Sequence, residues 1–275
     1  MSAFAQTNLA LYRQLLDRGY APEDLAPVQR AYFFSARAVS ARLRGSGKPF
    51  VCHLVGTASI LAELDQSLEV IQAALLHAMY IKSQADFGRA DRTRKGKKSI
   101  RRRRRILVRE FGREVEGLVY AYHRFKWRYH KSRIDEDTIA AGGLYGREAV
   151  LLRLANELED FLDGAVHLHG RAGESEKVRK GAAWRLRYME ACESNLIHAA
   201  EYLGYPQLAG WYREAFSQTR AMPDMTPLRT GYYASVRVPP PSLESEESGS
   251  RQSPRKAGIA RRVLRRLVRF PRRRG

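Results

Sequence analysis

Hydrophobic residues recur at helical spacing through most of the first 220 residues of the chain. Residues 7–18 carry leucines at such intervals, and Gly19 ends that segment. No stretch shows the sustained alternation of polar and apolar residues that indicates strands. The pattern predicts an all-α fold, with helices over residues 7–18, 22–43, 52–64, 68–81, 100–111, 113–127, 147–169, 174–203 and 206–218.

Differences in polarity divide the chain into segments. The predicted helices 52–64 and 68–81 are apolar almost all round, so we expect them to be buried. Residues 83–99 form a polar, basic loop. After Arg220 the chain becomes rich in proline, serine and glutamate, with too little apolar surface to offset the entropy lost on ordering. We therefore predict an N-terminal helix over 1–24, a helical domain over 25–220, a disordered linker over 221–255 and a basic tail over 256–275.

The tail pattern predicts a basic amphipathic helix. At about 100° per residue, apolar residues fill one half of the helical wheel and arginines fill the other half. An anionic membrane surface or an acidic protein partner would suit such a helix, with each arginine contributing on the order of 1 kcal/mol near a membrane. An irregular cationic tail is the alternative. The contact residues that we expect are Ile259, Arg262, Val263, Arg266, Leu267 and Phe270.

The formal net charge of +20 is concentrated in two segments. Residues 89–105 carry a net +10 and residues 251–275 a net +11, which leaves −1 for the rest of the chain. This distribution indicates local attraction of anions and argues against a surface that wraps a polyanion. Residues 89–108 contain no aromatic side chain for base stacking, so nucleic-acid binding would be electrostatic and non-specific.

Cysteine usage and the N-terminus bear on localisation. Cys52 and Cys192 lie far apart in predicted helices and form no CxxC pair, as expected of a reducing compartment. The first twenty residues have neither a basic start nor a long apolar run, so we expect no signal peptide, and no window is long enough to span a bilayer. The expected localisation is cytoplasmic, with the tail able to hold the protein at the inner face of the membrane.

Several motifs resemble the hydrolase domain of RelA/SpoT guanosine-polyphosphate proteins, which has an all-helical HD fold. Residues 44–53 (RGSGKPFVCH) are similar to that domain's opening pattern R-x-S-G-x-P-Y-x-x-H. Residues 73–78 (AALLHA) resemble A-A-L-L-H-D, and residues 110–119 (EFGREVEGLV) resemble E-F-G-x-E-V-x-x-L-V. Residues 151–156 (LLRLAN) resemble L-L-K-L-A-D, and residues 196–204 resemble the segment that closes the domain.

The resemblance implies a metal site built by three helices. In the family, a His from the first motif, a His-Asp doublet from the second and an Asp from the fourth hold one divalent metal, usually manganese. Imidazole and carboxylate ligands suit such an ion. The metal lowers the pKa of a bound water, which then attacks the phosphate ester or anhydride. An acidic pair shortly after the doublet assists the reaction.

This chain keeps the two histidines of that ligand set and lacks its two aspartates. His53 and His77 match the two histidines, whereas Ala78 replaces the doublet aspartate and Asn156 replaces the last aspartate. Ile81 and Lys82 stand in place of the acidic pair. Each change removes negative charge from the position of the metal, so we interpret the pattern as a degenerate metal site.

Other roles for these residues remain open. His53 and His77 could be residual ligands, or buried histidines bonded to the backbone or to each other. Asp160 follows Asn156 by one helical turn and Asp163 by two, so either could supply a ligand or pair on the helix surface. On the same helical wheel Glu157 and Glu159 point elsewhere, and we expect them to be solvated.

Basic residues near the predicted site could attract a phosphate. The counterpart of Arg44 in the resembled family lies beside the nucleotide base. We take Arg44, Lys48 and Lys82 as candidates for binding a phosphate or nucleotide ligand. A solvated run of charge is the alternative.

The leading functional interpretation is a catalytically impaired RelA/SpoT-like HD domain that senses a nucleotide or phosphate, or acts as a scaffold, without a cofactor. The alternative is an active phosphohydrolase that uses Mn²⁺ or another divalent metal at His53, His77, Asn156 and Asp160. A non-specific nucleic-acid-associated protein is the third interpretation. We expect no synthetase domain and hence no synthesis of guanosine polyphosphates.

Overall fold

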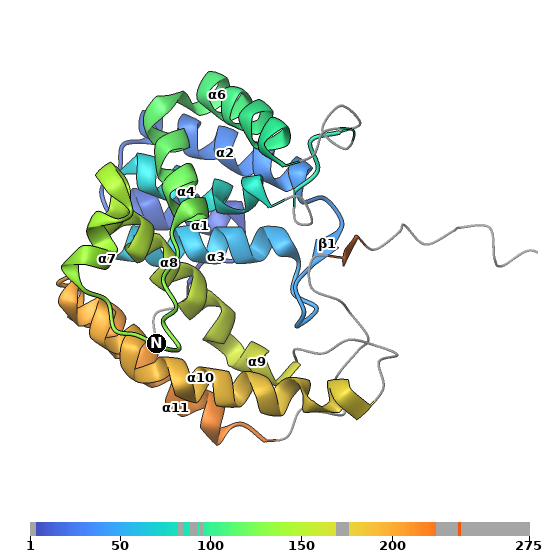
Figure 1. Ribbon diagram of the computed structural model, residues 1–275. Helices are drawn as coiled ribbons and strands as arrows, with labels where there is room; N and C mark the ends of the chain where they lie inside the picture. Colours follow the sequence, from blue (N-terminus) through green and yellow to red (C-terminus); the bar gives the residue numbers. More distant parts are fainter. Residues whose placement is uncertain are drawn as a thin grey trace, which may run out of the picture. The chain divides into compact units, whose positions relative to one another are not determined.

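The computed structural model describes residues 4–81, 85–88, 93, 96–168, 176–223 and 236–237 (Figure 1). Within these ranges the chain is almost entirely helical, which confirms the predicted all-α fold. The α-helices are α1 (Asn8–Asp17), α2 (Leu25–Ala38), α3 (Phe50–Glu63), α4 (Leu68–Leu76), α6 (Lys97–Arg124), α7 (Glu136–Ala140), α8 (Gly146–Phe161), α9 (Ala165–Leu168), α10 (Glu176–Tyr202) and α11 (Pro206–Ala221). Short 3-10 helices are η1 (Pro22–Asp24), η2 (His77–Tyr80), η3 (Gly143–Tyr145) and η4 (Leu162–Gly164).

Local capping signals start several of these helices. The Thr7 hydroxyl accepts a hydrogen bond from the Ala10 amide at 3.3 Å, and Ser67 does the same for Val70 at 3.4 Å. Both residues satisfy amides that a helix start leaves without partners. Pro206 begins α11, where its missing N–H costs nothing.

The three helices α3, α4 and α8 form the centre of the bundle (Figure 1). α3 packs against α1, α4 and α8, α4 also packs against α2 and α6, and α8 also packs against α6, α7 and α11. Nearly every residue of α3 and α4 is buried, as their apolar sequences predict. Polar side chains that these helices carry must therefore find partners inside the protein.

Two predicted helices were too long. α2 ends at Ala38 instead of near Leu43, because Ala41 adopts a left-handed φ of 55° and the chain leaves the helix there. The next residues form β1 (Arg42–Leu43), which pairs antiparallel with β2 (Val236–Arg237) inside the segment that we predicted as linker. α8 ends at Phe161, and Asp163 with a φ of 55° separates it from α9.

The middle of the chain contains a kinked helix, α6, and a short helix, α7. α6 is kinked at Gly112, whose φ of 88° suits glycine, at the position where we predicted one helix to end and another to begin. We did not predict the short helix α7. Asp135 caps it by accepting a hydrogen bond from the Thr138 amide at 2.8 Å, a sequence signal that could have indicated the helix.

Within the described ranges, no helix combines the length and apolar character that crossing a membrane requires. The helices belong to one compact unit, Met1–Val238. The predicted tail over 256–275 and most of the predicted linker lie outside the described residues.

Candidate functional site

The residues selected by the resemblance meet where α3, η2 and α8 come together. His53 is on α3, His77 begins η2 and Asn156 is on α8. All three are buried, and the rings of His53 and His77 pack edge to face with centroids 5.3 Å apart. Residues separated by more than a hundred positions therefore share one interior site.

His53 is held from both sides by α8. Its Nδ1 contacts the Glu159 carboxylate, and its Nε2 lies 3.1 Å from Oδ1 of Asn156. The Asn156 amide nitrogen donates to Oε1 of Glu157 at 3.2 Å, which directs Oδ1 toward His53. Both ring nitrogens of His53 are thus engaged by side chains of the protein.

A glycine on α3 makes room for Glu159. Gly56 follows His53 by one turn, and a Cβ atom there would lie 2.7 Å from Cγ of Glu159 and 2.8 Å from its Oε1. Such distances are too short for any side chain larger than hydrogen. The close approach of α8 to α3 at Gly56 therefore lets Glu159 reach His53.

The expectation that Glu157 and Glu159 are solvated was wrong. Glu157 is 8% exposed and Glu159 is 1% exposed. A helical wheel assumes a solvent face, but α8 is covered by α3, α6, α7, α10 and α11. Carboxylates on such a helix have to be paired inside the protein, because burying them alone is costly.

Each of three acidic residues on α8 is paired with a basic residue. The Arg44 guanidinium contacts Asp160, the Lys48 ammonium contacts Glu159, and Nη1 of Arg153 lies 3.6 Å from Oε1 of Glu157. Arg44 and Lys48 come from the segment just before α3. The site therefore contains three carboxylates matched by three internal cations, before His53 is counted.

His77 is fixed in one neutral form. Its Nδ1–H donates to the Ala74 carbonyl at 2.7 Å, since a carbonyl can only accept. Burial and the neighbouring His53 lower the pKa of His77 well below its usual value. Its Nε2 is thus left with a lone pair, and His77 lines a cavity beside α8.

This cavity has a volume of about 290 Å³. Arginines and tyrosines dominate its wall, and the Arg153 guanidinium stacks on the Tyr122 ring at 4.2 Å. Burial raises the pKa of Tyr122 and of Tyr188 to about 12, so both phenols remain protonated donors. The lining residues are Arg44, His77, Ile81, Tyr122, Tyr129, Arg153, Asn156, Glu157, Asp160 and Tyr188.

Glu157 is the most unusual acid in the cavity wall. Burial raises the pKa of its carboxyl, an effect that the nearby Arg153 opposes. The cavity can therefore take up a proton at Glu157 more readily than an exposed glutamate would.

A divalent metal fits this arrangement poorly. His53, Glu159 and Asp160 place ligand atoms within 4.8 Å of one another, which is close enough for a metal site. However, Lys48 and Arg44 already contact the two carboxylates. A metal would have to displace both cations, because the cluster offers it no uncompensated negative charge.

Other residues selected from the sequence lie elsewhere. Ala78 is fully buried in the hydrophobic core and Ile81 lines the cavity, so neither position offers a ligand. Asp163 is exposed at the end of α8. Lys82 and the tail residues Ile259, Arg262, Val263, Arg266, Leu267 and Phe270 lie outside the described residues.

The sequence did not lead us to several residues that line the cavity beside α8. Arg153 and Glu157 are spaced i and i+4, a helical ion-pair signal that could have been noticed. The three tyrosines come from α6, the following loop and α10, and no sequence spacing connects them.

Comparison with known families matches residues 36–126 to a family described as "Domain of unknown function (DUF6817)". This match contains His53 and His77 but not the carboxylates of α8. Its description assigns no activity.

Individual proteins match over shorter stretches. The chain is 38% identical over 69 residues, or 25% of its length, to the "Bifunctional (p)ppGpp synthase/hydrolase RelA" of Mycobacterium tuberculosis. It is 41% identical over 59 residues to the "Bifunctional (p)ppGpp synthase/hydrolase SpoT" of Escherichia coli K12, or 21% of its length. These stretches span 9% and 8% of the two relatives.

One solved structure, titled "A metazoan ortholog of SpoT hydrolyzes ppGpp and plays a role in starvation responses", covers 74% of this chain and 97% of its own at 18% identity. Its TM-score is 0.44. The sequence matches to RelA and SpoT proteins, together with the helical fold described above, support the resemblance of this chain to a RelA/SpoT-type HD domain.

Proposed function

We propose that this protein is a RelA/SpoT-like HD domain that binds a phosphorylated ligand without a resident metal and does not hydrolyse it by HD chemistry. One observation carries the proposal. Lys48 and Arg44 contact Glu159 and Asp160, the carboxylates that lie beside His53. Internal cations thus stand where a divalent ion would have to bind.

The substitutions at the motif positions agree with this proposal. Alanine at position 78 has no ligand atom, and the Asn156 amide is occupied by His53 and Glu157. Metal-assisted hydrolysis needs an ion that lowers the pKa of a bound water. Without such an ion the site retains binding groups but no activated nucleophile.

The cavity supports binding of an anionic, partly aromatic ligand. Arg44 and Arg153 line it together with three tyrosines and with Asp160 and Glu157, the carboxylates that these two arginines contact. Arginine suits phosphate oxygens, and tyrosine rings suit a planar base. A volume of about 290 Å³ is near the lower end for a small-molecule site, so the ligand would be a nucleotide or a part of one.

The test combines metal analysis, activity and binding on the full chain. We expect substoichiometric metal in purified protein, no manganese-dependent release of pyrophosphate from guanosine tetraphosphate, and binding of that nucleotide by calorimetry with or without EDTA. Arg153→Gln should weaken binding. Arg128→Gln, a change at an exposed arginine outside the cavity lining, should leave binding unchanged. Nucleotide binding that requires manganese would refute the proposal.

The second candidate function is a metal-dependent phosphohydrolase. It is favoured by the proximity of His53, Glu159 and Asp160, whose ligand atoms lie within 4.8 Å of one another. In that case manganese would displace Lys48 and Arg44, and turnover would disappear in Glu159→Gln. Robust turnover with such sensitivity would replace our proposal by this one.

A further inference from the structure

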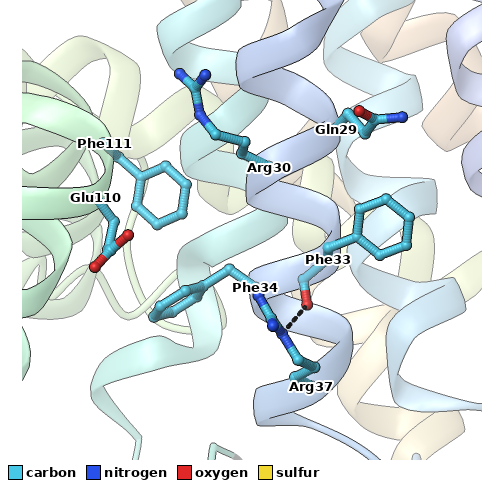
Figure 2. Close-up of a pocket in the computed structure, with 7 residues that line it drawn as sticks. All are labelled: Gln29, Arg30, Phe33, Phe34, Arg37, Glu110 and Phe111. Carbon is cyan, nitrogen blue, oxygen red and sulfur yellow. Dashed lines mark hydrogen bonds between the residues drawn. The ribbon is translucent and has the colours of Figure 1, made fainter.

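A second hollow lies on another face of the bundle, between α2 and α6 (Figure 2). Both helices pack on α4, and a groove of about 430 Å³ opens between them. One face of α2 supplies most of its wall. The lining residues are Gln29, Arg30, Phe33, Phe34, Arg37, Glu110 and Phe111.

The groove has an aromatic floor. Phe34 and Phe111 point toward one another from the two helices and pack edge to face, with centroids 5.2 Å apart (Figure 2). Phe33 is 48% exposed on the outer side of α2. A neighbouring hollow of about 320 Å³ shares Phe34, Arg37 and Glu110 and extends the groove toward Phe87. Among the described residues, aromatic surface of the groove therefore remains exposed.

The α2 rim of the groove is basic, and the start of α6 carries many cations. Arg30 and Arg37 are exposed on α2. Residues 97–113, at the start of α6, contain nine Lys/Arg and one acid, Glu110. Nη2 of Arg109 contacts that acid at 2.5 Å, so the acid is already neutralised. Arg103, Arg104 and Arg109 are engaged in contacts within the protein. The other exposed cations of this stretch, which make the start of α6 basic, are Lys97, Lys98, Arg101, Arg105 and Arg113.

We propose that the groove between α2 and α6 binds an acidic amphipathic helix of a partner protein. Apolar side chains of such a helix would lie on Phe33, Phe34 and Phe111. Its acidic residues would face the arginines of the α2 rim and the basic start of α6. Laying the apolar face of a helix into a groove between helices is a common recognition mode, and opposite charges at the rim select the partner.

Nucleic acid and lipid surfaces fit the groove less well. The rings of Phe34 and Phe111 pack against each other, which leaves no open pair of faces on which successive bases could stack. A hollow between two helices accepts protruding side chains, whereas a membrane offers a broad surface.

The test uses three synthetic peptides and the full chain. The first is an amphipathic helix with leucine and phenylalanine on one face and glutamate on the other. The second replaces every glutamate by lysine, and the third scrambles the order of the first. We expect saturable, salt-sensitive binding of the first peptide by fluorescence anisotropy, and at least about tenfold weaker binding of the other two.

Charge reversal locates the binding site. Arg30→Glu combined with Arg37→Glu should weaken binding of the acidic peptide at least about tenfold. The matched control combines Arg124→Glu with Arg187→Glu, which changes the net charge equally at exposed positions outside the groove. Because all four arginines are exposed, the variants should fold, and circular dichroism verifies this.

Three outcomes would overturn the proposal. Equal loss of binding in the groove variant and the control would indicate a general charge effect. Equal binding of the lysine peptide would exclude selection for acidic partners. Tighter binding of a duplex RNA or of phosphatidylglycerol vesicles through Arg30 and Arg37 would assign the surface to those ligands instead. Neither cavity ligand nor metal enters this test, so it is independent of the function proposed above.

Discussion

At the scale of single residues, the lack of a side chain at Gly56 makes the room that Glu159 occupies beside His53. A Cβ atom at this position would meet Glu159 at 2.7 Å. It would also meet Nε2 of Gln6 at 2.8 Å, so both side chains would have to shift. The shift of Glu159 would loosen its contacts with His53 and Lys48.

We therefore expect Gly56→Ala to lower the free energy of unfolding by about 1–3 kcal/mol, as overpacking does in other interiors. Urea denaturation measures the change. The matched control is Gly210→Ala on α11, where a Cβ atom would meet nothing within 4 Å. Alanine in an open helix interior should stabilise the protein by about 0.5–1 kcal/mol. Opposite signs for the two substitutions are expected, and equal effects would contradict the close approach at Gly56.

His77 predicts a pH dependence of stability. The folded pKa of His77 lies well below the unfolded value of 6.5 because of burial and the neighbouring His53. Between these two values the unfolded chain binds more protons, so stability should rise with pH across this window and be lost in acid.

One such group contributes a slope of up to about 1.4 kcal/mol per pH unit. Glu157 acts in the opposite direction, since burial raises its folded pKa and the folded state binds the extra proton. The contribution of His77 is therefore measured as the difference between the wild type and His77→Gln in denaturation at several pH values. An unchanged slope in the variant would mean that His77 is not buried in its neutral form.

At the scale of secondary-structure elements, α8 determines the chemistry of the site. It carries Asn156 and the three paired carboxylates, and it is surrounded by other helices. The segment before α3 supplies two of the neutralising cations. Changes in the ion pairing between these two elements should therefore change what the site binds.

Removing the internal cations should create affinity for a metal. In Arg44→Gln combined with Lys48→Gln, Asp160 loses its contact with Arg44 and Glu159 loses its contact with Lys48. We expect Zn²⁺ or Mn²⁺ to bind at least about tenfold more tightly than in the wild type, because removing even one unit charge a few ångström away is worth more than about 1.4 kcal/mol to a divalent ion.

Calorimetric titration with each metal measures this gain. Arg13→Gln, which breaks an exposed ion pair on α1, is the control and should leave metal affinity unchanged. If the wild type already binds as tightly as the double variant, Lys48 and Arg44 do not exclude the metal.

We expect the Arg153–Glu157 pair to couple the binding of an anion to the uptake of a proton. Protonation of Glu157 would free the Arg153 guanidinium for an anion, so inorganic pyrophosphate should bind more tightly as pH falls through the raised pKa of Glu157. Glu157→Gln should bind tightly at every pH and lose this dependence. Calorimetry from neutral to mildly acidic pH measures both, and a pH dependence that persists in the variant would count against this coupling.

At the scale of the whole molecule, the basic tail remains a prediction. We expect the full chain to float with phosphatidylglycerol vesicles and not with phosphatidylcholine vesicles, because its arginines would meet anionic headgroups. Arg262→Glu combined with Arg266→Glu should reduce flotation, whereas Arg30→Glu combined with Arg37→Glu should not. Equal flotation of the wild type and the tail variant would remove the membrane hypothesis.

The order of residues alone indicated most of the helices and the burial of α3 and α4. A helix with a buried face is apparent in the sequence as hydrophobic residues at helical spacing. The ends of α1, α3 and α11 could therefore be predicted to within a few residues. The breaks at Ala41 and Asp163 could not, because they depend on backbone conformations that ordinary residues adopt only in a supporting context. The motifs also identified His53, His77 and Asn156 as members of one site.

Most of the electrostatics of that site depend on how the helices pack. Whether a carboxylate on α8 faces water or Lys48 depends on which helices surround α8, and helical periodicity carries no such information. The sequence suggested that the site had lost acidic residues, whereas the fold brings Glu157, Glu159 and Asp160 into it and neutralises each with a basic side chain. The pairs that Arg44 and Lys48 form with α8 join segments more than a hundred residues apart, so they exist only once these segments are packed together.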